Sequence, residues 1–93
     1  MLNIVKIVGD SMFPTLSAGD FVCVWRRLKR INVGDLVVCD HPEYKRMIKR
    51  VAAIDLDGRY LLEGDNPTSL ASEKMGWFGL DNLYGKVIFK IKK

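Results

Sequence analysis

Residues 46–63 read Arg46-Met47-Ile48-Lys49-Arg50-Val51-Ala52-Ala53-Ile54-Asp55-Leu56-Asp57-Gly58-Arg59-Tyr60-Leu61-Leu62-Glu63. Two largely apolar runs, 46–54 and 59–63, flank a turn that contains Asp57-Gly58. This dipeptide favours a β-hairpin, because glycine supplies the positive φ that a tight turn between two strands requires. The stretch therefore predicts an antiparallel pair of strands, and the rest of the chain extends the same pattern.

Four further runs have β character, and they are separated by turn signals rich in glycine, aspartate and asparagine: 4–8, 20–26, 35–40 and 85–91. The last run alternates most clearly, with Val87, Phe89 and Ile91 on one face. Only residues 69–75 favour a short helix. We expect a mostly β chain that forms a single coiled antiparallel, barrel-like sheet, in one domain over residues 1–93.

Composition narrows the class of protein. The chain has 93 residues and 48% hydrophobic residues, which is enough for one compact domain with a core. Cys23 and Cys39 both lie in β-like runs, so we expect reduced core thiols, and a disulfide stays open only if the two strands are neighbours. With one histidine and no paired cysteines, we expect no metal site.

The chain contains no apolar stretch long enough to cross a bilayer, and residues 1–8 lack the apolar core of a secretory signal. We therefore expect a cytoplasmic protein. Membrane association is expected only if an anchor has been removed from the chain.

The segment Gly9-Asp10-Ser11-Met12-Phe13-Pro14-Thr15-Leu16 is a candidate nucleophile turn. Proline restricts its own φ and the backbone of Phe13, and glycine permits a close backbone approach. Such a turn can present the Ser11 hydroxyl outward and leave its backbone N–H as an oxyanion donor. Taken alone, a serine in a turn more often caps that turn.

Lys49 is the candidate partner of this serine. If 46–54 is a strand, Met47, Lys49 and Val51 share one face, so the ammonium lies between apolar neighbours. Burial disfavours the charged form and lowers the pKa, which would make Lys49 a general base for Ser11. The competing interpretation is a lysine whose stem covers the core while its head reaches water. Arginine does not deprotonate in proteins, so Arg46 and Arg50 are excluded as bases.

Five segments occur in order along the chain: Ser11-Met12-Phe13-Pro14-Thr15-Leu16, Gly19-Asp20-Phe21-Val22-Cys23-Val24, Val33-Gly34-Asp35-Leu36-Val37-Val38, Ile48-Lys49-Arg50-Val51 and Gly64-Asp65-Asn66. This series resembles the catalytic core of the type I signal peptidases and their relatives. The resemblance implies the fold of the signal peptidase and repressor C-terminal type, with Ser11 as nucleophile and Lys49 as general base. It also implies a serine endopeptidase that acts on an extended peptide segment of a protein substrate, without metal or cofactor. Among the small soluble members, the chain is similar to the nickel-type superoxide dismutase maturation proteases, which also have His-Pro before the lysine, here His41-Pro42.

The remaining site residues are assigned by the same resemblance. Gly9 stands where many relatives have a hydroxyl residue, so the oxyanion hole would rely on backbone N–H groups around Gly9, Asp10 and Ser11. Ser69 and Ser72 are candidate helpers that orient the lysine, although the acid and arginine expected near them are replaced by Ala71 and Glu73. Met12 and Phe13 are candidate substrate-pocket residues, with core packing as the commoner role.

Two alternatives stay open. A self-cleaving domain like that of the SOS-response repressors resembles the same architecture, but it needs a scissile Ala-Gly or Cys-Gly pair before the serine, and residues 1–10 contain neither. A small basic β-barrel that binds nucleic acid would use the basic clusters 26–30 and 45–50, with Trp25 and Tyr44 stacking on bases. Solvated charges are the default for such runs, so we expect no nucleic-acid partner.

Overall fold

The computed structural model describes residues 2–7, 12–26, 31–41, 45–66 and 77–91. Its elements are β1 (Leu2–Lys6), β2 (Phe21–Trp25), β3 (Leu36–His41), β4 (Lys45–Ile54), β5 (Tyr60–Glu63), β6 (Trp77–Phe78), the 3-10 helix η1 (Leu80–Asn82) and β7 (Leu83–Ile91). The four further β-like runs and the hairpin expected from the sequence are confirmed to within two residues at each end, and the last residue of the run 4–8 lies outside the described residues. The expected helix at 69–75 lies outside the described residues.

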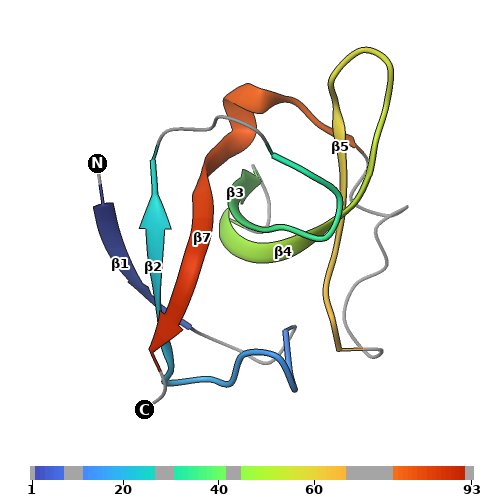
Figure 1. Cartoon of the computed structure of the whole chain (residues 1–93). Helices are drawn as coiled ribbons and strands as arrows, with labels where there is room; N and C mark the ends of the chain where they lie inside the picture. Colours follow the sequence, from blue (N-terminus) through green and yellow to red (C-terminus); the bar gives the residue numbers. More distant parts are fainter. Residues whose placement is uncertain (1, 8–11, 27–30, 42–44, 67–76, 92–93) are drawn as a thin grey trace.

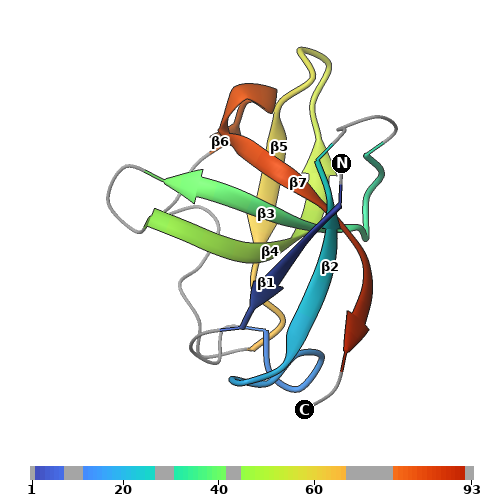
Figure 2. The ribbon, with the colours of Figure 1, turned by 90° about the vertical axis from the view of Figure 1, so that its left-hand side faces the viewer.

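All seven strands form one open antiparallel sheet in the order β1-β2-β7-β3-β4-β5-β6. The sheet is strongly coiled: β1, β2 and β7 lie in the plane of Figure 1, whereas β3 and β4 are seen nearly end-on. Figure 2 shows the same β3–β4 pair from the side, crossing behind β1. The predicted fold class, a mostly β chain with a coiled antiparallel sheet, is therefore confirmed.

The β4–β5 hairpin forms where Asp57-Gly58 predicted it. Gly58 has φ of 79°, and its N–H donates to the carbonyl of Asp55 at 3.1 Å. Asp55 also accepts hydrogen bonds from the backbone N–H groups of Asp57 and Arg59, which closes the turn with its own side chain.

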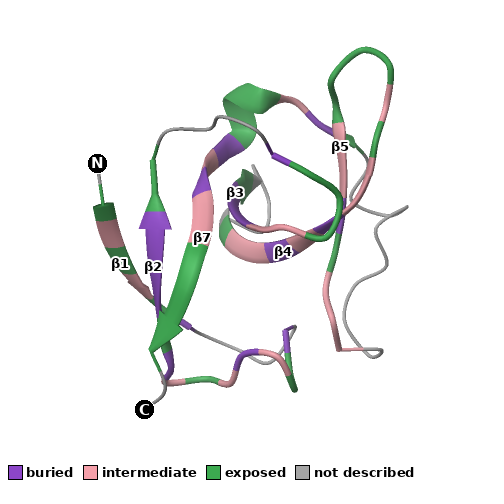
Figure 3. Ribbon diagram, in the orientation of Figure 1, coloured by how far each residue is buried: buried purple, intermediate pink, exposed green. Residues whose placement is uncertain are grey.

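Buried residues gather in two cores, on opposite faces of the β3–β4 pair. Figure 3 shows buried stretches on β2, β3, β4 and β7. The first core consists of Ile31, Val37, Cys39, Val51, Leu62, Phe78 and Leu83. The second core consists of Ile7, Met12, Leu16, Val22, Val24 and Val38. Because strand alternation sends successive side chains to opposite faces, β4 contributes to both cores and its middle is covered on both sides. That cover places Lys49 out of water.

The two cysteines are free thiols, and both are buried. Cys23 lies on β2 and Cys39 on β3, and β7 runs between these strands. The expected reduced core thiols are confirmed. No helix in the described part of the chain has the length and apolarity needed to cross a membrane.

Candidate functional site

Lys49 lies in the middle of β4, and its side chain is only 2% exposed. Val37 is directly opposite it in the β3–β4 register, and Cys39 pairs with Met47 one step along the same face. Val51 follows on this face and is itself buried. The predicted face of Met47, Lys49 and Val51 is therefore confirmed, and it packs on the first core.

Burial lowers the pKa of Lys49 from its ordinary value, because the apolar surroundings disfavour the ammonium. The neighbouring Cys39 thiolate would oppose this shift, but burial raises the pKa of Cys39 to about 12. The thiol therefore stays neutral at physiological pH and supplies no counter-charge. Among the described residues, no carboxylate forms a salt bridge with Lys49. This arrangement favours a neutral amine that can accept a proton.

The turn that follows Ser11 is described from Met12 onward. Met12 is 3% exposed and Leu16 is fully buried, so both anchor the turn in the second core. The N–H of Leu16 donates to the carbonyl of Met12 at 2.9 Å, and the Phe13-Pro14 peptide bond is cis. Phe13 is 53% exposed. Of the two candidate pocket residues, Met12 is a core residue and Phe13 faces solvent.

Several predicted site residues lie outside the described residues. These are the nucleophile Ser11, the oxyanion-turn residues Gly9 and Asp10, and the candidate helpers Ser69 and Ser72. Their assignments remain predictions.

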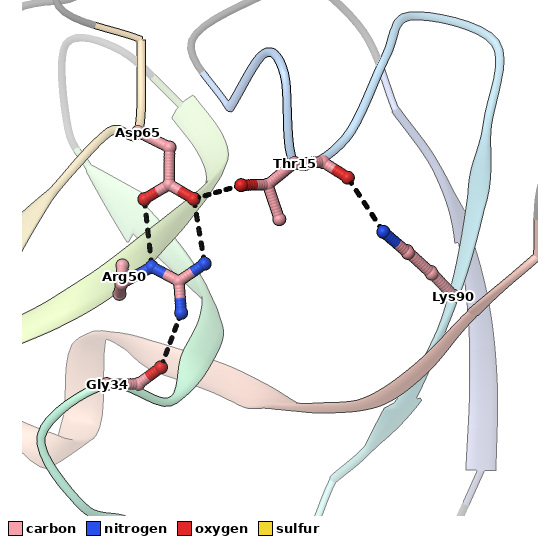
Figure 4. Close-up of polar contacts among 5 residues, drawn as sticks. All are labelled: Thr15, Gly34, Arg50, Asp65 and Lys90. Atoms are coloured by element: carbon pink, nitrogen blue, oxygen red, sulfur yellow. Dashed lines mark hydrogen bonds and ion pairs between the residues drawn. The ribbon is translucent and has the colours of Figure 1, made fainter.

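A polar clamp ties the turn after Ser11 to the strand that carries Lys49 (Figure 4). Arg50 on β4 donates from Nε and Nη2 to the two carboxylate oxygens of Asp65, at 2.8 Å and 2.7 Å. Asp65 also accepts a hydrogen bond from the Thr15 hydroxyl. The planar guanidinium matches the carboxylate in this two-pronged geometry. The clamp thereby holds together three segments of the sequence, one of which contains the candidate base.

Two further bonds extend this clamp. Arg50 Nη1 donates to the carbonyl of Gly34 at 2.7 Å, and Lys90 Nζ donates to the carbonyl of Thr15 at 3.1 Å. Gly34 has φ of 97°, a left-handed conformation that glycine tolerates and that turns its carbonyl toward the arginine. Hydrogen bonds from Arg50 and Thr15 hold the pKa of Asp65 below its ordinary value, so the carboxylate is ionised at neutral pH.

The sequence did not reveal the clamp. Thr15 and Asp65 occur in the ordered motifs, and Arg50 directly follows the candidate base, but none of the three was assigned a role. The signal that could have found them is the pairing of an invariably charged arginine with an aspartate in the Gly64-Asp65-Asn66 turn.

A comparison with protein families agrees with the resemblance drawn from the ordered motifs. A family model described as Peptidase S24-like matches residues 2–78, which include the candidate serine turn, the lysine strand and the clamp. No curated protein matches the chain significantly. Since the match spans most of the sequence, the chain belongs to the Peptidase S24-like family.

Proposed function

We propose that this protein is a serine endopeptidase in which Ser11 is the nucleophile and Lys49 is the general base. The observation that carries the proposal is Lys49, a lysine 2% exposed on a strand between two cores, with a lowered pKa. A buried lysine is costly unless the site uses its neutral form, and a neutral amine is the group that a serine nucleophile needs. Membership in a peptidase family supports the same chemistry.

In the proposed reaction the neutral Lys49 Nζ accepts the proton of Ser11 Oγ as that oxygen bonds to the scissile carbonyl carbon. The negative charge on the carbonyl oxygen is stabilised by backbone N–H groups of the turn at Gly9, Asp10 and Ser11. The carbon–nitrogen bond then breaks, and the lysine ammonium returns the proton to the leaving amine. Water, deprotonated by the same lysine, hydrolyses the acyl-enzyme and restores Ser11.

We further propose that the substrate is an extended leader or signal-type segment of another protein. A precursor of nickel-type superoxide dismutase is the first substrate to test, on the basis of resemblance. The exposed Phe13, two residues after the nucleophile, is available to contact such a segment.

The test is cleavage of candidate precursor proteins by wild type, Ser11→Ala and Lys49→Met, with the fold checked by circular dichroism. Lys6→Met is the matched control, because Lys6 is an exposed lysine on β1. We expect both site variants to lose at least about a hundredfold in rate, as is typical when a general base or nucleophile is removed. Folded Ser11→Ala or Lys49→Met protein that cleaves like wild type would contradict the mechanism.

Self-cleavage is the second candidate function, because the Peptidase S24-like match is also compatible with a repressor-like role. The two functions separate in a mixing experiment, in which wild type is incubated with tagged Ser11→Ala protein or with a precursor. Cleavage of wild type by itself, at a rate independent of its concentration, would indicate the self-cleaving role. Turnover of a separate precursor indicates the protease.

A further inference from the structure

Two arginines stack on one tyrosine ring, that of Tyr84 on β7. The guanidinium carbon of Arg26 lies 3.6 Å from the ring centroid of Tyr84, and that of Arg46 lies 3.8 Å from it. Arg26 directly follows β2, Tyr84 is on β7 and Arg46 is on β4. The fold thus brings one arginine from each of the two basic clusters of the sequence, Arg26 and Arg46, to one aromatic side chain. We call Arg26, Tyr84 and Arg46 the arginine platform.

The arginine platform is held in place by neighbouring strands. Asn3 on β1 donates to the Tyr84 hydroxyl, and Tyr84 packs against the second core. Arg26 Nε donates to the Tyr84 carbonyl at 2.8 Å, and Arg46 Nε donates to Asp40 on β3 at 3.1 Å. Support for the arginine platform therefore comes from β1, through Asn3, and from β3, through Asp40. Because the ring and the two guanidinium groups are already held in place, binding a ligand costs less conformational entropy of the protein.

The arginine platform carries two positive charges. Both arginines are exposed, Arg46 by 49% of its side chain. The hydrogen bonds of the two arginines within the described part of the chain use their Nε atoms. Among the described residues, Asp40 is the carboxylate that forms a salt bridge with the platform, through Arg46. Two guanidinium forks match carboxylate groups in a planar, two-pronged manner.

We propose that the arginine platform is an exosite that binds an acidic segment of the protein substrate, an inference that rests on the proposed endopeptidase function. Arg46 lies three residues before Lys49, about 10 Å along β4, and the alternation of the strand places their side chains on opposite faces. The platform therefore binds a part of the substrate that is remote from the scissile bond. Because the exosite is separate from the base, it contributes to substrate affinity and leaves the chemical step unchanged.

A peptide is favoured over a nucleic acid by the size of the site. Two guanidinium groups, one of them engaged with Asp40, suit one or two carboxylates. Binding a phosphate backbone without sequence preference typically takes a longer basic groove with several stacking aromatic rings.

The test measures binding of a fluorescent peptide with a run of glutamates, and of a matched peptide with glutamines, by fluorescence anisotropy. The protein carries Ser11→Ala, so the peptide is not cut and the result does not depend on catalysis. Arg26→Gln and Arg46→Gln should each weaken binding of the glutamate peptide by about three- to tenfold. Arg59→Gln is the control, because Arg59 is an exposed arginine of the distant hairpin, paired with Asp55 and Asp57.

Equal binding of the two peptides, or unchanged affinity in both arginine variants, would overturn the proposal. Single-stranded oligothymidine that binds more tightly than the glutamate peptide, and is lost in the same variants, would assign the platform to nucleic acid instead. In cleavage assays the protein keeps the wild-type Ser11 and the peptides carry glutamates. Arg26→Gln should then raise KM and leave kcat unchanged. If no peptide is cleaved, the anisotropy result still decides on the exosite, so failure of the proposed function is recognised separately.

Discussion

Replacing Asp65 with asparagine tests whether the clamp holds the serine turn to β4. Asparagine keeps the shape of the side chain but loses the charge, and it leaves Arg50 without its carboxylate partner. Buried hydrogen bonds to a charged group contribute about 1.5–3 kcal/mol each, whereas exposed ion pairs contribute about 0.2–1 kcal/mol. The two side chains are 17% and 33% exposed, between these limits. We expect a loss of about 2 kcal/mol in the free energy of unfolding at pH 7.

The assay is urea and thermal unfolding of Asp65→Asn and wild type, followed by circular dichroism. A loss of about 2 kcal/mol corresponds to a Tm lower by roughly 8–16 °C for a domain of this size. The matched control is Asp57→Asn. The Asp57 carboxylate is 81% exposed and lies 3.7 Å from Arg59, so its loss should change stability by less than about 0.5 kcal/mol.

The pH dependence gives a second readout. The pKa of the Asp65 carboxyl is lowered in the folded chain from 3.8, mainly by the hydrogen bonds from Arg50. The stability that this shift contributes is fully present above pH 3.8 and is lost as the pH falls through the folded-state pKa. The difference between wild type and Asp65→Asn should therefore narrow in acid. A variant as stable as wild type at pH 7, or a gap that does not narrow in acid, would refute the reasoning.

Two further outcomes follow from the buried strands. The rate of precursor cleavage should rise with pH through a pKa below 10.5, the ordinary value for lysine, because Lys49 must lose its proton to act as a base; a rise only above 10.5 would count against it. Gly85→Ala should destabilise the fold by about 1–3 kcal/mol, because the added methyl group would collide with the buried Val24 side chain and lie 2.9 Å from the Trp25 carbonyl oxygen. Gly79→Ala, whose methyl group would meet nothing within 4 Å, should be close to neutral in the same urea unfolding measurement.

Local pattern predicted most of the strands of this fold. The alternation in 46–54 and the Asp57-Gly58 turn are properties of neighbouring residues, so the β4–β5 hairpin could be recognised without the structure. The same alternation predicted that Lys49 faces Met47 and Val51, which the structure confirms. The strand Trp77–Phe78 was missed because two residues are too short to show a period.

Alternation does not tell which face of a strand meets the core. In β2, Val22 and Val24 are fully buried, whereas the larger Phe21 and Trp25 are 37% and 40% exposed. In β7, Phe89 is 54% exposed although its run alternates most clearly. Which face is covered depends on the strands that pack against it, and these strands are far apart in the sequence.

The candidate site was predictable only as separate parts. Ser11 and Lys49 were chosen by the chemistry of their side chains and by the ordered motifs. The clamp of Thr15, Arg50 and Asp65 joins three segments, and the arginine platform joins residues at the end of β2, on β7 and on β4. Neither can be derived from local spacing, because each depends on the order of strands in the sheet.

The position of β7 has a consequence for how the protein is made. Strand β7, Leu83–Ile91, pairs with β2 on one side and with β3 on the other. In the described sheet it is the only strand that links β1–β2 to β3–β4–β5–β6. On the ribosome, the turn after Ser11 and the strand of Lys49 emerge well before this joining strand. The proposed peptidase activity should therefore appear only after residue 91 has left the exit tunnel.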